Sequence, residues 1–192
     1  KRDNDRVDIA KLDFDDVAGD SLTGGYIIKI DKYTGTGGVD WLSDFPDLAG
    51  GPMEIQYHYP EANVMHPQQK DYIEHFMDSF EYALAGPNFT DSLIGYSKYI
   101  DVNSFIDFYI VNELAKDIDA YRLSSYLYKD RDDNGGKLTM GPLWDFNLAF
   151  GNADYCSGGI PTGWEVNSGC GGNNPFWFER LLDDTTYQNK LK

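Results

Sequence analysis

The first 60 residues carry the patterns of β-strands. Segments 7–12 and 53–59 alternate apolar and polar side chains, and segment 24–31 is rich in β-branched and aromatic residues after a glycine pair. Both patterns are typical of strands. Turn-forming residues punctuate the stretch 34–52, so we expect a loop there, and Pro60 should end the third strand.

From Pro67 onward the apolar residues follow the period of a helix. Five of them recur at the spacing of one helix face, namely Ile73, Phe76, Met77, Phe80 and Leu84. Pro67 suits a first helical position, and the pair Gly86-Pro87 suits the stop. The spacing therefore predicts a helix of about five turns.

The second half of the chain predicts another helix, a hairpin and terminal helices. Apolar residues fill so much of 103–115 that this helix should be buried on most sides. Segments 123–129 and 137–140 predict two strands joined by an Asp/Asn/Gly turn, and 175–191 has helical spacing. Because strands precede helices without a βαβ repeat, the pattern indicates the α+β fold class.

Size and charge limit which kinds of protein this chain can be. The chain has 192 residues, 41% of them hydrophobic, which suits one domain. No run approaches the roughly 18 apolar residues that a membrane span needs. The 32 acidic residues against 16 basic ones give a net charge of −16. This charge argues against nucleic acid as a partner, although acidity also serves solubility alone.

The two ends of the sequence suggest a fragment or a processed product. The chain begins Lys1-Arg2-Asp3, without an initiator Met or the apolar stretch of a signal peptide. It ends on Asn189-Lys190-Leu191-Lys192, which is typical of the middle of a helix. We therefore expect a single domain over 1–192 that is incomplete at both ends.

The two cysteines, Cys156 and Cys170, lie in a glycine-rich stretch with little else to hold it. A disulfide that closes a loop of about 15 residues stabilises a protein by roughly 3 kcal/mol. A metal site is a weak alternative, because the sequence has no third Cys and no His nearby. We predict a disulfide and hence an exported protein.

Candidate catalytic carboxylates follow the second predicted helix and the predicted hairpin. Asp117 and Asp119 come at the helix end, where the helix dipole disfavours negative charge unless a cation or the loop geometry compensates. Asp145 lies in the otherwise apolar run 141–152, with the Asn147 amide two residues later. A buried Asp in such a run needs a partner.

The spacing of these residues resembles the layout of a protein kinase. Kinases carry an Asp and an Asn five residues later in the catalytic loop, and a metal-binding Asp-Phe-Gly after a hairpin. Here the residue five after Asp119 is Ser124, and Asp145-Phe146 follows the predicted hairpin. The structural alternative is that one Asp caps a turn and another pairs with a nearby Arg.

Several segments together resemble the CotH (spore coat protein H) kinase-like family, over most of the chain. The specific parts are the Trp-Asp block 141–152 and the loop with Asp119 after the helix end Asn112-Glu113-Leu114. Segments 24–31, 126–130 and 176–182 support them. By this likeness Asp119 is the catalytic carboxylate and Asp145 the principal metal ligand, with Asn147 close by.

The resemblance also implies a fold, a reaction and a location. The fold is α+β and atypical protein-kinase-like, mostly the helical lobe with part of the strand-rich lobe. The reaction is phosphorylation of Ser or Thr on a protein substrate and depends on ATP with Mg²⁺ or Mn²⁺. The location is extracytoplasmic, that is, secreted, at the cell surface or in a spore coat.

Two departures from the family pattern bear on the site. Many relatives have Asn in the loop after the catalytic Asp, whereas this chain has Leu123-Ser124-Ser125, so the Ser124 hydroxyl becomes the candidate second metal ligand. The family's first strands, expected to cradle phosphates, precede the start of this chain. We nominate Lys29 for phosphate contact, with a solvated strand lysine as the alternative interpretation.

One further motif is interpreted as structural. Asp130-Arg131-Asp132-Asp133-Asn134-Gly135 matches the first half of a calcium-binding EF-hand loop, but Gly141 stands where the loop needs a Glu. We interpret the segment as the turn of the hairpin.

Two other functions stay open beside the kinase. A non-catalytic cell-envelope module with a degenerate kinase fold would bind protein or glycan through Trp and Tyr residues, and Ser124 in place of Asn favours it. A glycoside hydrolase would use Asp119 and Asp145 as its carboxylate pair, with Trp144 and Tyr121 stacking on sugar. Dependence on a nucleotide separates the kinase from the hydrolase.

Overall fold

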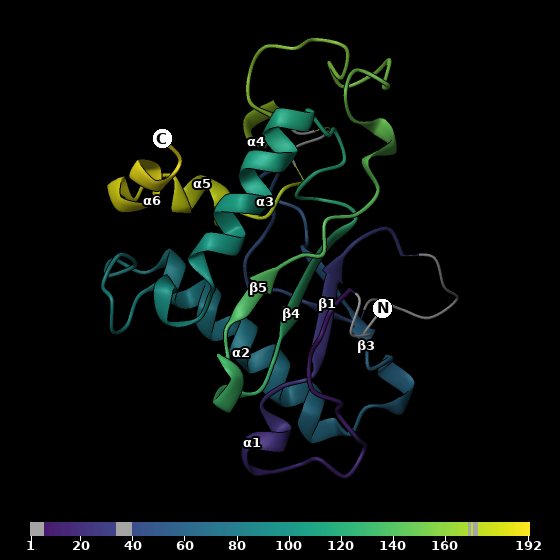
Figure 1. Ribbon diagram of the computed structural model, residues 1–192, viewed down its shortest axis with the longest axis vertical. Helices are drawn as coiled ribbons and strands as arrows, with labels where there is room; N and C mark the ends of the chain where they lie inside the picture. The colour runs from purple at the N-terminus through teal and green to yellow at the C-terminus, as the bar shows by residue number, and fades with distance from the viewer. Residues whose placement is uncertain (1–5, 34–39, 169, 171–172) are drawn as a thin grey trace.

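Five strands form one antiparallel sheet in a computed structural model that describes residues 6–33, 40–168, 170 and 173–192. The strands lie in the order β2-β3-β1-β4-β5 (Figure 1). Their bounds are Tyr26–Ile30 (β1), Trp41–Leu42 (β2), Glu54–Tyr59 (β3), Ser125–Lys129 (β4) and Leu138–Met140 (β5). The helices are Gly19–Leu22 (α1), Pro67–Ala85 (α2), Val102–Ala115 (α3), Glu165–Ser168 (α4), Trp177–Leu181 (α5) and Thr185–Lys190 (α6). The predicted α+β class is confirmed.

β1 is the central strand, and both of its faces are covered. Ile28 belongs to the main core with residues of α2 and α3, whereas Ile27 packs with Val7 and Ile9 on the other face. The backbone of Arg131 passes so close to Gly24 that a Cβ there would lie 1.9 Å from the Arg131 nitrogen. The chain therefore enters β1 at a position that only glycine can occupy.

The two long helices begin and end close to where their patterns predict. Pro67 lies in the first turn of α2, and His66 caps this helix by accepting the N–H of Gln68. α2 lies across the sheet (Figure 1), and its apolar stripe belongs to the core shared with the sheet. At the start of α3 the Asp101 side chain accepts the N–H groups of Asn103 and Ser104, which are donors that a helix leaves without backbone partners.

One strand prediction and one loop prediction differ from the structure. Segment 7–12 forms no strand but an extended run with an isolated bridge at Val7. Its apolar residues Val7, Ile9 and Leu12 are buried, so the alternation reflects burial against the neighbouring sheet. The predicted loop 34–52 contains β2, which pairs with β3; residues 34–39 of that loop lie outside the described residues.

α3 is buried on most sides, as predicted, but one of its faces is exposed. Leu114 is 80% exposed and Ile110 is 42% exposed. Both line an apolar groove of about 990 Å³, together with Trp164 and Leu191. Apolar composition thus overestimates burial here, because part of α3 faces this groove instead of the core. Within the described residues, no helix is long and apolar enough to cross a membrane.

Glu81 of α2 is a carboxylic acid inside the core. Its side chain is fully buried and accepts hydrogen bonds from the Ser43 hydroxyl at 2.6 Å and the Trp177 indole N–H at 2.7 Å. Burial raises the pKa of Glu81 to about 7, although these two donors oppose the shift. The folded state therefore favours the protonated form of Glu81.

Glu81→Gln should change how folding stability depends on pH. The folded pKa of Glu81 lies above its ordinary value of 4.5, so its contribution to stability is full below pH 4.5 and is lost as the pH rises to about 7. Over this interval the variant should gain about 2–3 kcal/mol on the wild type, because a Gln amide can bond both partners. Urea unfolding at several pH values measures the difference. Parallel pH profiles of Glu81→Gln and wild type would contradict it, and Glu179→Gln on the exposed surface is the control variant.

Candidate functional site

Left-handed backbone conformations of non-glycine residues are concentrated in one part of the chain, and five of them lie in two segments that carry the predicted site residues. In the described residues, seven non-glycine residues have positive φ, and all lie between 116 and 157. They include Lys116, Tyr121 and Ser124 between α3 and β4, and Asp145 after β5. Such a conformation costs roughly 1–2 kcal/mol per residue, and backbone strain gathers at functional sites. Residues 116–124, called here the Asp119 loop, and the block 141–152 form the candidate site.

The candidate metal ligands Ser124 and Asp145 meet between these segments. The Ser124 hydroxyl donates to Asp145 Oδ2 at 3.5 Å across 21 positions of sequence. The expectation that Asp145 is buried is wrong, because the segment around it runs over the surface and Trp144 and Asp145 are exposed. Asn147 is exposed too, in the 3-10 turn Phe146–Leu148, and its side chain makes no hydrogen bond with the described part of the chain.

The end of β1 brings a lysine and a carboxylate to the same place. Ile30 pairs with Ser125 in the sheet, so the end of β1 lies beside the start of β4. Asp31 Oδ1 accepts the N–H of Ser124 at 3.4 Å, and Asp31 Oδ2 accepts from Lys29 Nζ at 2.9 Å. The Lys29 side chain is only 16% exposed. It is therefore an ion-paired residue next to the site rather than a solvated strand lysine.

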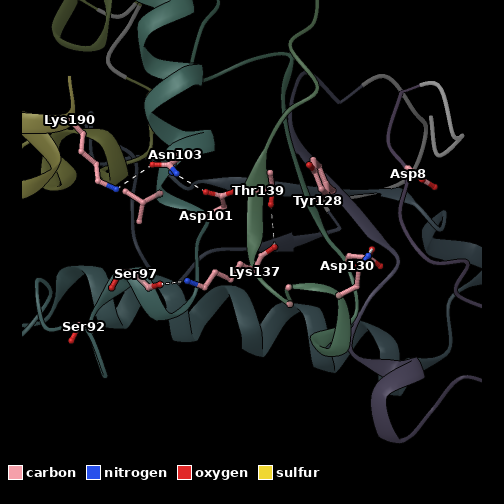
Figure 2. Close-up of a pocket in the computed structure, with 14 residues that line it drawn as sticks. Asp8, Ser92, Ser97, Asp101, Asn103, Tyr128, Asp130, Lys137, Thr139 and Lys190 are labelled. Carbon is pink, nitrogen blue, oxygen red and sulfur yellow. Dashed lines mark hydrogen bonds between the residues drawn. The ribbon is translucent and has the colours of Figure 1, made fainter. Parts of the chain in front are cut away.

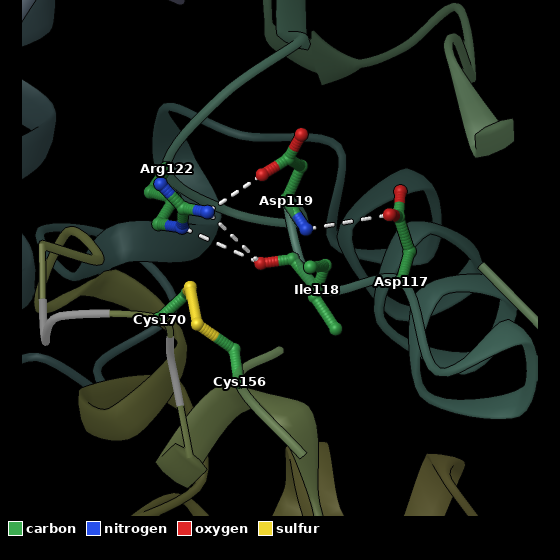
Figure 3. Close-up of a disulfide and its surroundings, with 6 residues drawn as sticks. All are labelled: Asp117, Ile118, Asp119, Arg122, Cys156 and Cys170. Carbon is green, nitrogen blue, oxygen red and sulfur yellow. Dashed lines mark hydrogen bonds and ion pairs between the residues drawn. A yellow bond between two sulfur atoms is a disulfide. The ribbon is translucent and has the colours of Figure 1, made fainter. Parts of the chain in front are cut away.

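Asp119 lies in a tight network within its loop (Figure 3). Arg122 donates to Asp119 Oδ1 at 2.6 Å, and Asp117 Oδ1 accepts the N–H of Asp119 at 3.3 Å. Asp117 thus caps a turn and Asp119 pairs with an Arg. These are the contacts expected if the two carboxylates have only structural roles. Asp119 Oδ2 makes no hydrogen bond within the described residues, so one acceptor oxygen remains for a ligand hydroxyl.

Negative charge accumulates around the Asp119 loop. Burial raises the pKa of Asp117 to about 6; the N–H of Asp119 opposes the shift, and the charges of Asp119, Asp145 and Glu165 add to it. A bound cation would reduce this repulsion. The arrangement of carboxylate oxygens therefore fits a divalent cation electrostatically.

The protein side chains alone do not complete the coordination shell of such a cation. The described residues contain no group of three or more His, Cys, Asp or Glu side chains that could hold a metal ion. Mg²⁺ is commonly bound by one or two carboxylates, with water and substrate phosphates completing the shell. Asp145, Ser124 and Asn147 supply a carboxylate, a hydroxyl and an amide, so water or phosphate oxygens have to complete the set.

A family model described as CotH kinase protein matches residues 5–192, nearly the whole chain. The chain belongs to this family. Neither a search of curated proteins nor one of solved structures gives a significant match. Membership confirms the resemblance seen in the Trp-Asp block and in the Asp119 loop, whereas the roles of single residues rest on their geometry.

The predicted disulfide is present in this CotH family member. Cys156 and Cys170 are bridged, with 5.2 Å between their Cα atoms. Figure 3 shows the bridge with residues 117–119 and Arg122 in its surroundings. A disulfide fits an extracytoplasmic location. The loop 156–170 that the bridge closes therefore lies close to the candidate site.

Two charged residues of this CotH site were not among the predicted ones. Asp31 is the last residue of a segment predicted as strand, and Arg122 follows Asp119 by three positions. The family resemblance assigns no role to either residue, although Asp31 ends a segment that supports the resemblance. The partner of Asp31 lies 93 residues away in the sequence, so only the pairing of β1 with β4 reveals it.

A polar pocket of about 690 Å³ lies away from these residues, between the β4–β5 turn and the start of α3 (Figure 2). Lys137 donates there to the Ser97 carbonyl at 2.7 Å, and Lys190 donates to Asn103 Oδ1 at 3.3 Å. None of the predicted site residues lines this pocket. The EF-hand-like segment borders it and forms the hairpin connection, as predicted.

Proposed function

We propose that this CotH family member is a protein kinase that transfers the γ-phosphoryl group of ATP to a Ser or Thr hydroxyl, with Mg²⁺ or Mn²⁺. The observation that carries the proposal is the convergence of three segments: the Lys29–Asp31 pair at the end of β1, Ser124 of the Asp119 loop, and Asp145. A phosphoryl-transfer site needs a cation for the phosphates, oxygen ligands for a metal and a carboxylate for the acceptor hydroxyl. The three segments supply all of these groups.

In the proposed reaction Asp119 is the general base. Asp119 Oδ2 takes the proton of the substrate hydroxyl while the hydroxyl oxygen bonds to the γ-phosphorus. The bond from that phosphorus to the oxygen bridging to the β-phosphate breaks, which yields ADP and the phosphorylated protein. Arg122 holds Asp119 through the other oxygen, and Lys29 contacts the phosphates.

The metal site of the proposed reaction consists of Asp145, Ser124 and Asn147. When bound there, the ion neutralises charge on the phosphates. We propose an atypical kinase-like fold and an extracytoplasmic protein substrate with an acceptor Ser. Family membership and the disulfide support these finer assignments.

Asp145→Asn should weaken binding of Mn²⁺ with ATP by about tenfold or more, since the loss of one charge contact worth about 1.4 kcal/mol changes Kd tenfold. The substitution keeps the shape of the side chain and removes its charge. Titration calorimetry with Mn²⁺ and ATP measures the change. The control is Asp107→Asn on the exposed face of α3. Equal affinities of Asp145→Asn and wild type would argue against Asp145 as a ligand.

Transfer of labelled γ-phosphate from ATP to a Ser-containing acceptor protein tests the proposed function directly. Incorporation should require Mg²⁺ or Mn²⁺ and should stop when a chelator removes the metal. If the folded chain neither binds nor turns over ATP with either metal, the kinase proposal fails.

The second candidate is the non-catalytic cell-envelope module. Several large aromatic side chains are exposed, with Trp144 at 56%, Trp164 at 60% and Phe150 at 76%, and exposed aromatic groups are common in sites that bind protein or glycan. The glycoside hydrolase has less support. Tyr121 is 1% exposed, so its ring cannot stack on a sugar as that alternative requires.

A further inference from the structure

Glu113, in the last turn of α3, holds two other segments through both of its carboxylate oxygens. Oε1 accepts the Tyr121 hydroxyl at 2.7 Å and the N–H of Val166 at 2.8 Å, and Oε2 accepts the N–H of Glu165 at 2.6 Å. Hydrogen bonds to an ionised acceptor are shorter and stronger than neutral ones. One side chain thus joins the Asp119 loop to the start of α4.

Tyr121 is the part of the Asp119 loop that Glu113 contacts. It has a φ of 70°, which is a genuine outlier for a bulky residue, and it is buried. Its ring meets that of Phe178 edge-on, with 4.8 Å between centroids. Tyr121 lies two residues after Asp119 and three before Ser124. Its backbone conformation therefore determines how these two predicted site residues are oriented relative to each other.

The segment on the other side of Glu113 is itself anchored. Lys116 Nζ lies 3.0 Å from Glu165 Oε2 in a nearly buried ion pair and donates to the Gly163 carbonyl at 3.4 Å. The Cys156–Cys170 bridge closes the loop that contains Gly163 and Glu165. Gly158 of the same loop lies so close to Ile118 that a Cβ there would be 3.0 Å from its Cγ2 atom. Glu113 therefore connects the Asp119 loop to the start of α4, a segment that the Lys116–Glu165 ion pair and the disulfide hold in place.

We propose that Glu113 is a positioning residue: its bond to Tyr121 holds the Asp119 loop in the conformation that brings Ser124 to Asp145 and orients Asp119. Glu113 is not one of the proposed substrate or metal ligands, and in this proposal it acts through Tyr121. The consequence for catalysis rests on the proposed kinase function, whereas the consequence for the loop does not.

Tyr121→Phe tests the inference with the loss of one oxygen atom. Glu113 keeps its two backbone donors in α4, so the variant does not leave this half-buried carboxylate without partners. We expect kcat for phosphate transfer to fall by about ten- to a hundredfold, because small misplacements of reacting groups have effects of this size. KM for ATP should change by less than about twofold, since ATP binding does not use Tyr121. The control Tyr109→Phe removes a hydroxyl that makes no hydrogen bond within the described residues, and its kcat should stay at the wild-type value.

A double-mutant cycle that combines Tyr121→Phe with Glu113→Gln tests whether Glu113 affects kcat through Tyr121. If Glu113 acts on catalysis through Tyr121, the double variant should have nearly the kcat of Glu113→Gln alone. Thermal unfolding of all four proteins reports stability separately, and Glu113→Gln is expected to lower the unfolding temperature through its bonds to α4. Losses of kcat that multiply in the double variant would contradict the proposal.

Amide hydrogen exchange gives a measurement that needs no activity. The N–H groups of residues 117–124 should exchange faster in Tyr121→Phe than in wild type and Tyr109→Phe, while those of α2 stay the same. If wild type transfers no phosphate, the kinase proposal fails, and exchange alone decides whether Glu113 positions the loop. Unchanged exchange in Tyr121→Phe, or an unchanged kcat in an active enzyme, overturns the inference.

Discussion

Asp119→Asn should lower kcat for phosphate transfer by about 10²–10⁴-fold, the usual effect of losing a general base. The Asn amide has the shape of the carboxylate but cannot take a proton from the acceptor hydroxyl. KM for ATP should change little, because Asp145 and Ser124 rather than Asp119 are the proposed metal ligands. Steady-state kinetics with labelled ATP, together with an unfolding curve for the folded variant, measure both quantities.

Arg122→Gln is the control that separates the catalytic role from the structural alternative. Arg122 donates to Asp119 Oδ1 at 2.6 Å, so Asp119→Asn also removes an ion pair. Arg122→Gln removes the same ion pair but keeps the carboxylate. If Asp119 is the base, Asp119→Asn should be far more damaging than Arg122→Gln. Equal losses in the two variants would mean that Asp119 matters only as the partner of Arg122.

Phe178→Ala should lower the free energy of unfolding by about 3–5 kcal/mol, the usual cost of deleting a buried aromatic side chain. Phe178 of α5 is 1% exposed. Its ring lies within 6.3 Å, between centroids, of four other rings, those of Phe105, Phe108, Tyr109 and Tyr121. The deletion leaves a cavity beneath the Asp119 loop that this packed cluster cannot easily fill.

Urea unfolding measures the effect of Phe178→Ala. The midpoint should fall while the slope of the transition stays constant, which marks a change in stability rather than in the extent of unfolding. Phe150→Ala is the matched control, because the Phe150 side chain is 76% exposed and exposed substitutions usually change stability by less than about 0.5 kcal/mol. Similar losses in the two variants would show that α5 does not anchor the core.

Local periodicity predicts most elements of this fold. The apolar spacing from Ile73 to Leu84 corresponds to α2, and the hairpin segments correspond to β4 and β5. Periodicity fails where the same alternation occurs in a buried segment that is not assigned as a strand, as in 7–12, or where an apolar helix face borders a groove, as at Leu114. In both cases the neighbours that decide the outcome lie far away in the sequence.

The sequence predicted which segments carry the candidate site residues, but not which of these residues contact one another. The likeness to the CotH family selects Asp119, Ser124, Asp145 and Asn147, and the structure brings Ser124 within 3.5 Å of Asp145. Motifs do not reveal Asp31, because its bond to Ser124 depends on the register of β1 against β4. Motifs also misjudge the burial of Asp145, since apolar neighbours in sequence do not have to be neighbours in the core.

The sequence by itself determined the family, the α+β class, the disulfide between the two cysteines and the boundaries of the long helices. These properties follow from residue types and from spacings within one element, which act over a few neighbouring positions. Only the tertiary structure decided which polar groups meet. Lys29 pairs with Asp31 and Asp119 with Arg122, and Glu113 accepts hydrogen bonds from Tyr121 and from α4. The physical reason is that strand register, helix packing and left-handed loop residues set these distances, and each depends on the whole fold.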